Sequence, residues 1–474
     1  MIPKSKYLFI ILVYLLAPPA CPQTQTFSLD EAIKTALKNN SDVKIAEMNV
    51  EKASAAVHEA FGYALPSLDF SAGFNHFINK PKTPFPDFAA LLGNATYSIL
   101  FDEKVIPRDN NKFKPVGYSL QSFALSNNYE TNLQLTQVLF SSAVFRGIGA
   151  SQIYLDLSKA QLRTTVSSTV FNVQKAFYGV LLTKQVYEIT KASFENAQDN
   201  YKNVSALYGQ GLVSEFDNLQ AQVQVENIRP TLLNMENKLK DAKDGLKILL
   251  GINPGNEIEV DGEITYQPMP IPEMQDVIDE VLKSNLSLQT LDLKARVDDA
   301  FIDLDRAEYW PNLAAFGNYS YAGSSDKWNF QNYSSLTVGL NFSINLWKGQ
   351  QTSHKVEQST ITYKQTEEQL AQLKDYLTAQ VKSNINELKR VQAVVETQDK
   401  NVSLAERAYQ IATVRYKEGT SNQLEVQNAD IALRQARLNR LQTVYSYLIS
   451  SYELEQIMGK VSLEYYSLFE SLND

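Results

Sequence analysis

The sequence predicts a mainly α-helical protein with a few membrane β-strands, in which long antiparallel helices form coiled-coil hairpins. Three observations predict this class. The run from Gln351 to Glu418 contains neither glycine nor proline, several stretches alternate apolar and polar residues, and the two halves of the sequence align with each other. At 474 residues the chain exceeds a usual single domain, so we expect two or three domains or one elongated architecture.

The N-terminus predicts an export signal over residues 1–23. Lys4 and Lys6 precede an apolar run that is too short to span a membrane but has the length of a signal-peptide core. Cys21 follows "LAPPA" and is a possible lipidation site, although Pro18 stands where lipoprotein signals usually carry leucine. Ordinary cleavage between Ala20 and Gln23 is the alternative.

The rest of the chain reads as two matched halves, which indicates an internal two-fold repeat. Residues 37–76 align without a gap with residues 282–321, and residues 208–222 align with residues 416–430. The first half holds about 37 extra residues in a proline- and asparagine-rich stretch from Phe77 to Val116. We expect this stretch to be a long loop.

Each half is predicted to contain a helix, a β-hairpin and a long helical hairpin. The first repeat spans residues 24–251, with its β-hairpin at 67–140 and its helical hairpin at 148–250. The second repeat spans residues 273–459, with its β-hairpin at 312–347 and its helical hairpin at 350–458. A linker at 252–272 joins the repeats, and a tail at 460–474 follows them.

Local signals support the predicted helices. Ser28, with Glu31 three residues later, is typical of a capping box that opens a helix. The next helix carries small apolar residues at alternating spacings of three and four, a coiled-coil seam that Asp298 and Asp305 interrupt in the second half. Glycines in "GQG" and "KEGT" reverse the long helices into hairpins, and Pro230 is expected to kink the first return helix.

The predicted strands have one apolar and one polar face. In "SSLTVGLNFSINLW" apolar residues occupy every second position from Leu336 to Leu346, and the other three strands follow a similar rule, with Phe316 as an exception. Their length suits transmembrane strands. Trp310 and Trp347 bracket the second hairpin and Phe140 matches Trp347, as interfacial aromatic residues would. A soluble β-sandwich is the alternative.

Four strands per chain predict an oligomer if the sheet enters a membrane. An open sheet has two edges whose backbone groups cannot face lipid, and closed membrane barrels need at least about eight strands. Three copies would supply a 12-stranded β-barrel with a polar interior. The long helices would extend that duct as an α-barrel tunnel.

Composition argues against other classes of function. The net charge of -9, without clustered lysine or arginine, argues against a nucleic-acid partner. Three histidines (His58, His76 and His354) and a single cysteine offer little for a metal site. No catalytic or nucleotide-binding motif is present, so we expect no enzyme activity, no metal and no cofactor.

The duplicated β-hairpin, long helix, tyrosine-glycine turn and return helix resemble the outer membrane efflux proteins of the TolC type, over essentially the whole mature chain. The resemblance implies a homotrimeric channel in the cell outer membrane, in contact with its lipid and extended by a periplasmic tunnel. It also implies a periplasmic adaptor protein and an inner-membrane pump of the RND or ABC type, in tripartite efflux or type I secretion. A periplasmic adaptor and a structural coiled-coil lipoprotein without a pore are the rival interpretations.

The resemblance also implies a gate near the helix turns. Asp217 and Tyr416 stand where family members have gate-forming partners, and Ser421 replaces an arginine that some members use. Glu425 and Asn428 occupy the positions of two carboxylates at the tunnel constriction, so one acid per chain remains. Alternatively, Asp217 and Glu425 are N-terminal helix acids favoured by the helix dipole.

The turns of the two helical hairpins, residues 209–214 and 418–422, are the expected contacts for the adaptor. The residues that define these tips are Gly209, Gly211, Ser214, Gly419 and Thr420.

Overall fold

The computed structural model describes residues 25–473. The predicted signal peptide and Cys21 lie outside the described residues. The chain divides into two compact units. We call residues 58–148 and 303–354 the sheet unit, and the described residues of 1–57, 149–302 and 355–474 the helical unit.

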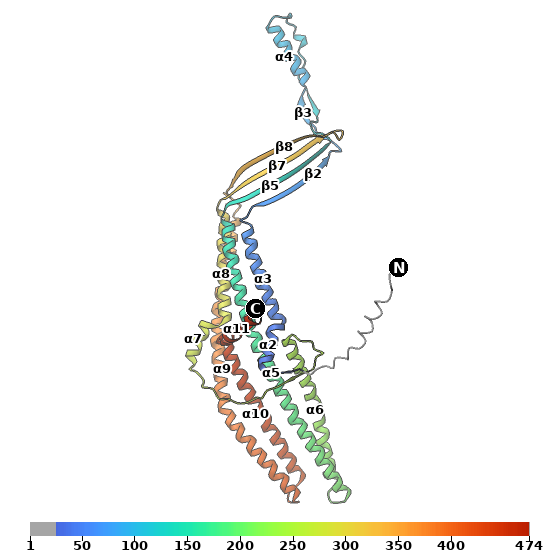
Figure 1. The fold of residues 1–474 in the computed structure, drawn as a ribbon, viewed down its shortest axis with the longest axis vertical. Coiled ribbons are helices and arrows are strands. Elements are labelled where there is room, and N and C mark those ends of the chain that lie inside the picture. The colour runs from blue at the N-terminus through green and yellow to red at the C-terminus, as the bar shows by residue number, and fades with distance from the viewer. Residues whose placement is uncertain (1–24, 474) are drawn as a thin grey trace, which may run out of the picture. The chain divides into compact units, whose positions relative to one another are not determined.

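The sheet unit is built on a four-stranded antiparallel sheet, which confirms the four predicted strands (Figure 1). The strands are β2 (Ser67–His76), β5 (Asn127–Ser141), β7 (Asn312–Ser325) and β8 (Gln331–Ser343), in the order β2-β5-β7-β8. Directly opposite residues share a face, so this register places the alternating apolar residues of all four strands on one side.

A β-bulge near the end of β5 changes the face on which Phe140 lies. Val138 pairs with Ala314 but Phe140 pairs with the next residue of β7, Leu313, so Leu139 is the extra residue. Without the bulge, strict alternation from Leu135 would place Phe140 on the polar face. The bulge brings it opposite Leu313, on the apolar face.

The long loop expected from Phe77 to Val116 is wrong in part, because the segment folds. It contains β3 (Thr83–Pro86), paired antiparallel with β4 (Tyr118–Gln121), the helix α4 (Phe88–Asp102) and the short helix η2 (Asn110–Lys112). Asp87 caps α4 by accepting a hydrogen bond from the Ala90 amide at 3.1 Å. We call residues 77–126 the arm.

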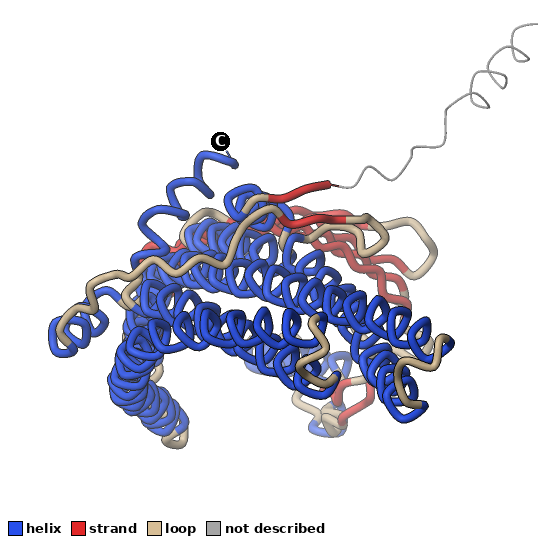
Figure 2. Tube along the Cα trace, turned by 90° about the horizontal axis from the view of Figure 1, so that it is seen from below, coloured by secondary structure: helices blue, strands red, loops and turns tan. Residues whose placement is uncertain are grey.

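The helical unit contains two long helical hairpins, whose helices lie side by side (Figures 1 and 2). One is formed by α5 (Ser142–Gly209) and α6 (Glu215–Leu250), the other by α9 (Gln351–Lys417) and α10 (Gln423–Ile457). The helix α5 begins before residue 148, where the first helical hairpin was expected to start, and continues through Gly147 and Gly149. Pro230 lies within α6, and the kink there stays a prediction.

Shorter elements complete the fold. They are α2 (Leu29–Asn39), α3 (Ser41–Gly62), α7 (Met274–Ser284), α8 (Leu286–Arg306), η3 (Ala307–Tyr309) and α11 (Lys460–Asn473). The capping box of Ser28 and Glu31 is confirmed at the start of α2. The linker holds an unexpected strand, β6 (Ile258–Val260), which pairs in parallel with β1 (Gln25–Phe27), and the expected tail is the helix α11.

The same docking contact occurs twice in the helical unit. The side-chain amide of Asn40, between α2 and α3, donates to the Leu249 carbonyl at 2.9 Å, and Asn285, between α7 and α8, donates to the Ile457 carbonyl at 2.9 Å. In each case a glycine follows that return helix with a positive φ, Gly251 at +65° and Gly459 at +73°. A Cβ on either glycine would collide with a backbone carbonyl.

The main core lies in the helical unit, where α2, α5, α6, α7, α9 and α10 bury valine, leucine and isoleucine side chains. Among the residues that the structure describes, no helix has both the length and the apolarity needed to cross a membrane.

Candidate functional site

The first candidate site is the apolar face of the sheet. Its members come from all four strands: Leu68, Phe70 and Phe74 of β2, Tyr129, Leu133 and Leu135 of β5, Leu313, Tyr319 and Tyr321 of β7, and Leu336, Val338, Leu340 and Phe342 of β8. The four β8 side chains are 73%, 77%, 67% and 63% exposed. A contiguous bare apolar surface of this kind marks an interaction site or a lipid contact.

The opposite face is mostly polar. It carries Asp69, Ser71 and Asn75 of β2, Asn128, Glu130, Asn132 and Gln134 of β5, Asn318 and Ser320 of β7, and Ser335, Thr337 and Asn341 of β8. Phe316 interrupts the pattern and lies over Gly339, where a Cβ would come within 2.9 Å of its ring. The ring thus fills the space that the absent side chain leaves.

Aromatic residues lie at both ends of the strands. The predicted Trp310, Trp347 and Phe140 are exposed near the start of β7, the end of β8 and the end of β5. Sequence reasoning missed a second group around the β7–β8 turn, where Phe74 stacks on Trp328 at 5.8 Å and Tyr129 meets Phe330 at 5.3 Å. The signal was present in the sequence as "KWNFQNY" between the two strands.

The two aromatic groups are separated by a length that suits a membrane. At about 3.3 Å per residue, the path along β5 from Tyr129 of the second group to Phe140 of the first runs roughly 33 Å when the bulge residue is left out. A strand tilt of about 40° reduces this to about 25 Å of height, the height of the apolar band of outer-membrane barrels. Within the described chain, β2 and β8 each have a strand neighbour on one side only, so the sheet keeps two open edges.

The second candidate site is the turn region of the two helical hairpins. Ser214 and Asp217 form a capping box at the start of α6, in which the Ser214 hydroxyl lies 2.6 Å from an Asp217 carboxylate oxygen and accepts from the Asp217 amide at 3.2 Å. Burial raises the pKa of Tyr416, and the negative charge of Asp217 raises this pKa further. The two residues belong to different hairpins and lie near enough for the charge of Asp217 to act on Tyr416.

Glu425 is held inside its own hairpin. Its backbone amide donates to the Asn422 side chain at 3.0 Å, and the Ser421 hydroxyl donates to its carboxylate at 2.6 Å. The Arg415 guanidinium lies 3.5 Å from the same carboxylate. Sequence reasoning missed Arg415, although it stands directly before Tyr416. Asn428 is exposed on α10.

The tips turn at glycines and carry the remaining predicted residues. Gly211 and Gly419 have φ of +74° and +71°, a conformation that side chains other than glycine disfavour. The Thr420 carbonyl accepts from Arg415 at 3.3 Å, so the second tip is tied to the same guanidinium as Glu425. Gly209 is the last residue of α5 and Ser214 caps α6.

Hydrogen bonds, not ion pairs, join the two hairpins near their tips. The Gln427 amide on α10 donates to the Gln224 carbonyl oxygen on α6. Ser193 on α5 donates to Asp430 on α10 at 2.8 Å and accepts from Arg434 at 3.3 Å. Across residues 190–230 and 395–440, all of which the structure describes, no ion pair connects one hairpin with the other.

The ion pairs that connect two helices in this region lie within the second hairpin. Besides Arg415 with Glu425, Arg437 of α10 pairs with Glu406 of α9 at 2.8 Å, and Arg440 pairs with Asp399. Two buried acceptor oxygens near the tips, on Asn218 and Gln423, have no hydrogen-bond partner.

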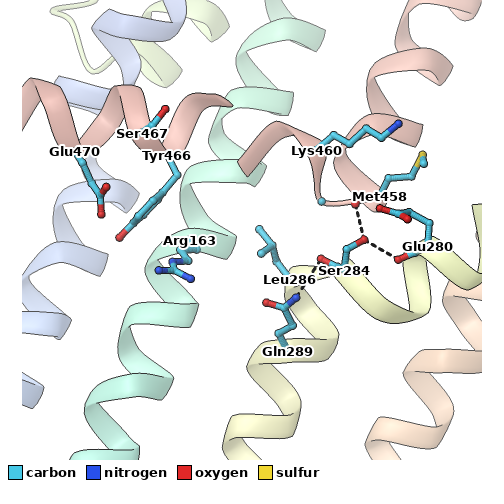
Figure 3. A pocket seen from close by; sticks show the side chains of 11 residues that line it. Arg163, Glu280, Ser284, Leu286, Gln289, Met458, Lys460, Tyr466, Ser467 and Glu470 are labelled. Carbon is cyan, nitrogen blue, oxygen red and sulfur yellow. Dashed lines mark hydrogen bonds between the residues drawn. The ribbon is translucent and has the colours of Figure 1, made fainter. Parts of the chain in front are cut away.

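A surface pocket in the helical unit lies apart from the predicted residues (Figure 3). Arg163 of α5 and Tyr466 of α11 line it, with the guanidinium 5.1 Å from the ring centre. Ser284 lies 2.8 Å from the Met458 carbonyl at its other end. These contacts fasten α11 and the end of α10 to the helices beside them. Within residues 25–473, no group of three or more His, Cys, Asp or Glu side chains is placed to hold a metal ion.

A sheet with a bare apolar face, a polar face and aromatic ends, accompanied by two long helical hairpins, defines the class of outer-membrane channel proteins. Residues 82–252 and 277–460 match the sequence model of the outer membrane efflux protein family. The match covers more than half of the chain. The chain belongs to this family, and its location is the outer membrane.

Individual relatives agree with the family. The outer membrane protein TolC of Escherichia coli is 23% identical over 417 residues, which cover 84% of this chain and 79% of TolC. The probable outer membrane lipoprotein SilC of Salmonella typhimurium is 21% identical over 450 residues, 90% of this chain and 84% of SilC. The crystal structure of the CmeC outer membrane channel of Campylobacter jejuni has 17% identity and a TM-score of 0.69, and the match covers 91% of this chain and 85% of that one.

Proposed function

We propose that three copies of the chain form the exit duct of a tripartite efflux or type I secretion system. The observation that carries the proposal is the sheet, which has a bare apolar face, a polar face and two open edges. In lipid each open edge would leave backbone groups without partners. Joining β8 of one copy to β2 of the next satisfies those groups and closes a 12-stranded barrel, with the polar face around a wet interior.

The chain is an internal duplication, and the repeat supports a tunnel of similar hairpins. Asn40 and Asn285 dock the two return helices by the same hydrogen bond, and Gly251 and Gly459 supply the close approach in each half. Three copies then contribute six similar helical hairpins to an α-barrel. The arm has no counterpart in the second half.

The hairpin tips form the periplasmic gate in this proposal. The negative charge of Asp217 acts on Tyr416 of the other hairpin, and the hydrogen bond from Gln427 to Gln224 joins the two hairpins nearby. Ser421 and Arg415 hold Glu425, so the three Glu425 carboxylates of a trimer line the constriction from fixed positions, together with the exposed Asn428. The ion-pair lock that some family members build with an arginine at the position of Ser421 is replaced here by these contacts.

The tip turns are the docking surface for the partners in this proposal. Gly209, Gly211, Ser214, Gly419 and Thr420 would meet a periplasmic adaptor protein, which links the duct to an inner-membrane pump of the RND or ABC type. A passive conduit of this kind needs neither a cofactor nor a catalytic group of its own.

The proposal is tested by extracting the full-length protein with detergent, measuring the mass of the assembly and recording from planar bilayers. Three chains per particle and stepwise ion conductance are expected. A monomer that stays in solution without detergent and conducts nothing would contradict the proposal, since such a molecule has satisfied its sheet edges and apolar face in another way.

A further inference from the structure

The helix α4 on the arm is rich in apolar residues and carries no charge on any side of its body. Its residues between Asp87 and Asp102 include no charged side chain. One side is covered by the arm itself: Phe101 is buried, and its ring lies 5.7 Å from Phe113 and 6.0 Å from Tyr97. The other side exposes several large apolar side chains, and the arm supplies no cover for them.

The outward side of α4 has the spacing of a coiled-coil seam. Phe88, Leu92, Ala95 and Ile99 follow one another at intervals of four, three and four residues. Phe88, Leu92 and Ile99 are 58%, 62% and 63% exposed. Alternating intervals of four and three residues are the pattern that a second helix of the same kind fits, knob into hole, with the small Ala95 allowing close approach.

The chemistry of the seam favours another α4 over a lipid surface. Helices that lie on membranes carry lysine or arginine opposite their apolar side, whereas α4 has no charge there and its opposite side is already packed. At 1.5 Å per residue the 15-residue helix is roughly 22 Å long, too short to cross a bilayer. The α4 helix of another copy presents the same row of uncharged apolar side chains and can pack against this one.

The base of the arm is fixed to the sheet, which gives every copy of α4 the same placement on its own sheet unit. Asp326, in the β7–β8 turn, forms an ion pair with Lys80 and accepts from the Ser126 amide and hydroxyl at 2.8 and 2.7 Å. The Phe77 amide donates to the Ser126 carbonyl at 2.7 Å and closes the base. Figure 1 shows β3 and α4 beyond this end of the sheet.

We propose that the α4 helices of neighbouring copies pack against one another along the seam of Phe88, Leu92, Ala95 and Ile99. The inference rests on the proposed trimer. The interaction ties the arms of the three copies together beyond the barrel strands and covers the apolar surface that each arm exposes alone. It gives the extra segment of the first repeat a role that the second repeat lacks.

The experiment introduces a cysteine on the seam of the full-length protein, Leu92→Cys or Ile99→Cys, and oxidises the detergent-extracted protein. With one seam cysteine in each of three copies, at most one disulfide forms per trimer, so we expect covalent pairs that contain up to two of every three chains. Lys112→Cys, exposed on the same arm but outside α4, is the matched control and should give at least tenfold fewer pairs. The unchanged protein reports any pairing through Cys21.

A second variant distinguishes cross-linking through a packed seam from cross-linking by random contact. It combines Leu92→Glu with Ile99→Cys in one protein, so that the seam carries a charge. We expect this variant to yield at least tenfold fewer covalent pairs than Ile99→Cys alone while the trimer persists. Intact trimers without seam cross-links, cross-linking that Leu92→Glu leaves unchanged, or cross-links to a different protein would each overturn the inference alone. A wild-type protein that is not a trimer would instead overturn the proposed function.

Discussion

Replacing Gln427 by alanine removes a neutral hydrogen bond between the two hairpins near their tips and should make the proposed duct open more often. The Gln427 amide donates to Gln224 on the other hairpin, and both side chains are half-buried. A neutral hydrogen bond contributes about 1 kcal/mol net. If each hairpin opens independently, the open probability rises about 5-fold, whereas a concerted opening of three copies loses about 3 kcal/mol and rises ~100-fold.

The assay is single-channel recording of the full-length protein in planar bilayers. Gln435→Ala is the matched control, because Gln435 donates a similar amide hydrogen bond at 2.8 Å, but to Asn439 within α10 alone. The double variant with Gln224→Ala should behave as Gln427→Ala does, since both remove one interaction. Equal open probabilities for Gln427→Ala, Gln435→Ala and the wild type would refute the reasoning.

Salt dependence adds a second, independent readout of the same prediction. The effect of Gln427→Ala should be the same at 0.1 M and 1 M salt, because no charge is lost. The pair of Arg415 and Glu425 has side chains that are 51% and 47% exposed, so its contribution is at most about 1 kcal/mol. The effect of Arg415→Ala should therefore be small at low salt and fade as the screening length falls from about 10 Å to 3 Å.

The remaining predictions concern folding and the membrane. Asn40→Ala and Asn285→Ala each remove the side-chain donor of a carbonyl at the end of a return helix. Each should lower the free energy of unfolding by about 2 kcal/mol, measured by thermal denaturation, and a loss in one half alone would contradict equivalent docking. Val338→Arg, on the apolar face, should reduce assembly into membranes by about 2–4 kcal/mol, whereas Thr337→Arg, on the polar face, should assemble normally and alter conductance. Hydrogen bonds from Lys80 and Ser126 lower the pKa of Asp326. The pKa of Asp326 in the folded protein lies below its pKa in the unfolded chain, so the stabilisation that its carboxylate provides is present above about pH 4 and is lost as the pH falls towards the folded pKa. Limited proteolysis at the base of the arm should therefore accelerate only in acid.

The faces of the sheet could be predicted from the sequence because the side-chain period of a strand is two. Once Leu336 and Val338 are assigned to one side, the rest of the strand follows, and the register in the structure agrees. The β-bulge at Leu139 could not be predicted, because an extra residue is visible only when the neighbouring strand fixes the register. The helix α4 was missed because its segment has no partner in the second half and is flanked by prolines and asparagines.

The residues at the hairpin tips were only partly predictable. Asp217 and Glu425 stand at recognisable positions, three residues after Ser214 and Asn422, where a helix start needs an acid or a cap. The pairing of Gln224 with Gln427 depends on how two helices are rotated about their axes, and one residue changes that angle by about 100°. Helical spacing within one segment therefore indicates which side chains share a face, but not which of them meets a side chain on another hairpin.

Near the tips, ion pairs stabilise the second hairpin itself, whereas neutral and charge-assisted hydrogen bonds join it to the first hairpin. Arg415, Arg437 and Arg440 all reach from one helix to the other within the second hairpin, so losing any one of them leaves two others to hold α9 and α10 together. The contacts between hairpins use Gln427 and Ser193, which have short hydrogen-bonding reach and depend on direction. Such contacts are lost within about 1 Å of displacement, whereas the attraction of an ion pair declines slowly with distance. The ion pairs therefore hold the two helices of the second hairpin together, whereas the hydrogen bonds to the first hairpin break after a small displacement. A substitution at the contact between the hairpins should change the fraction of closed channels more than a substitution within the second hairpin.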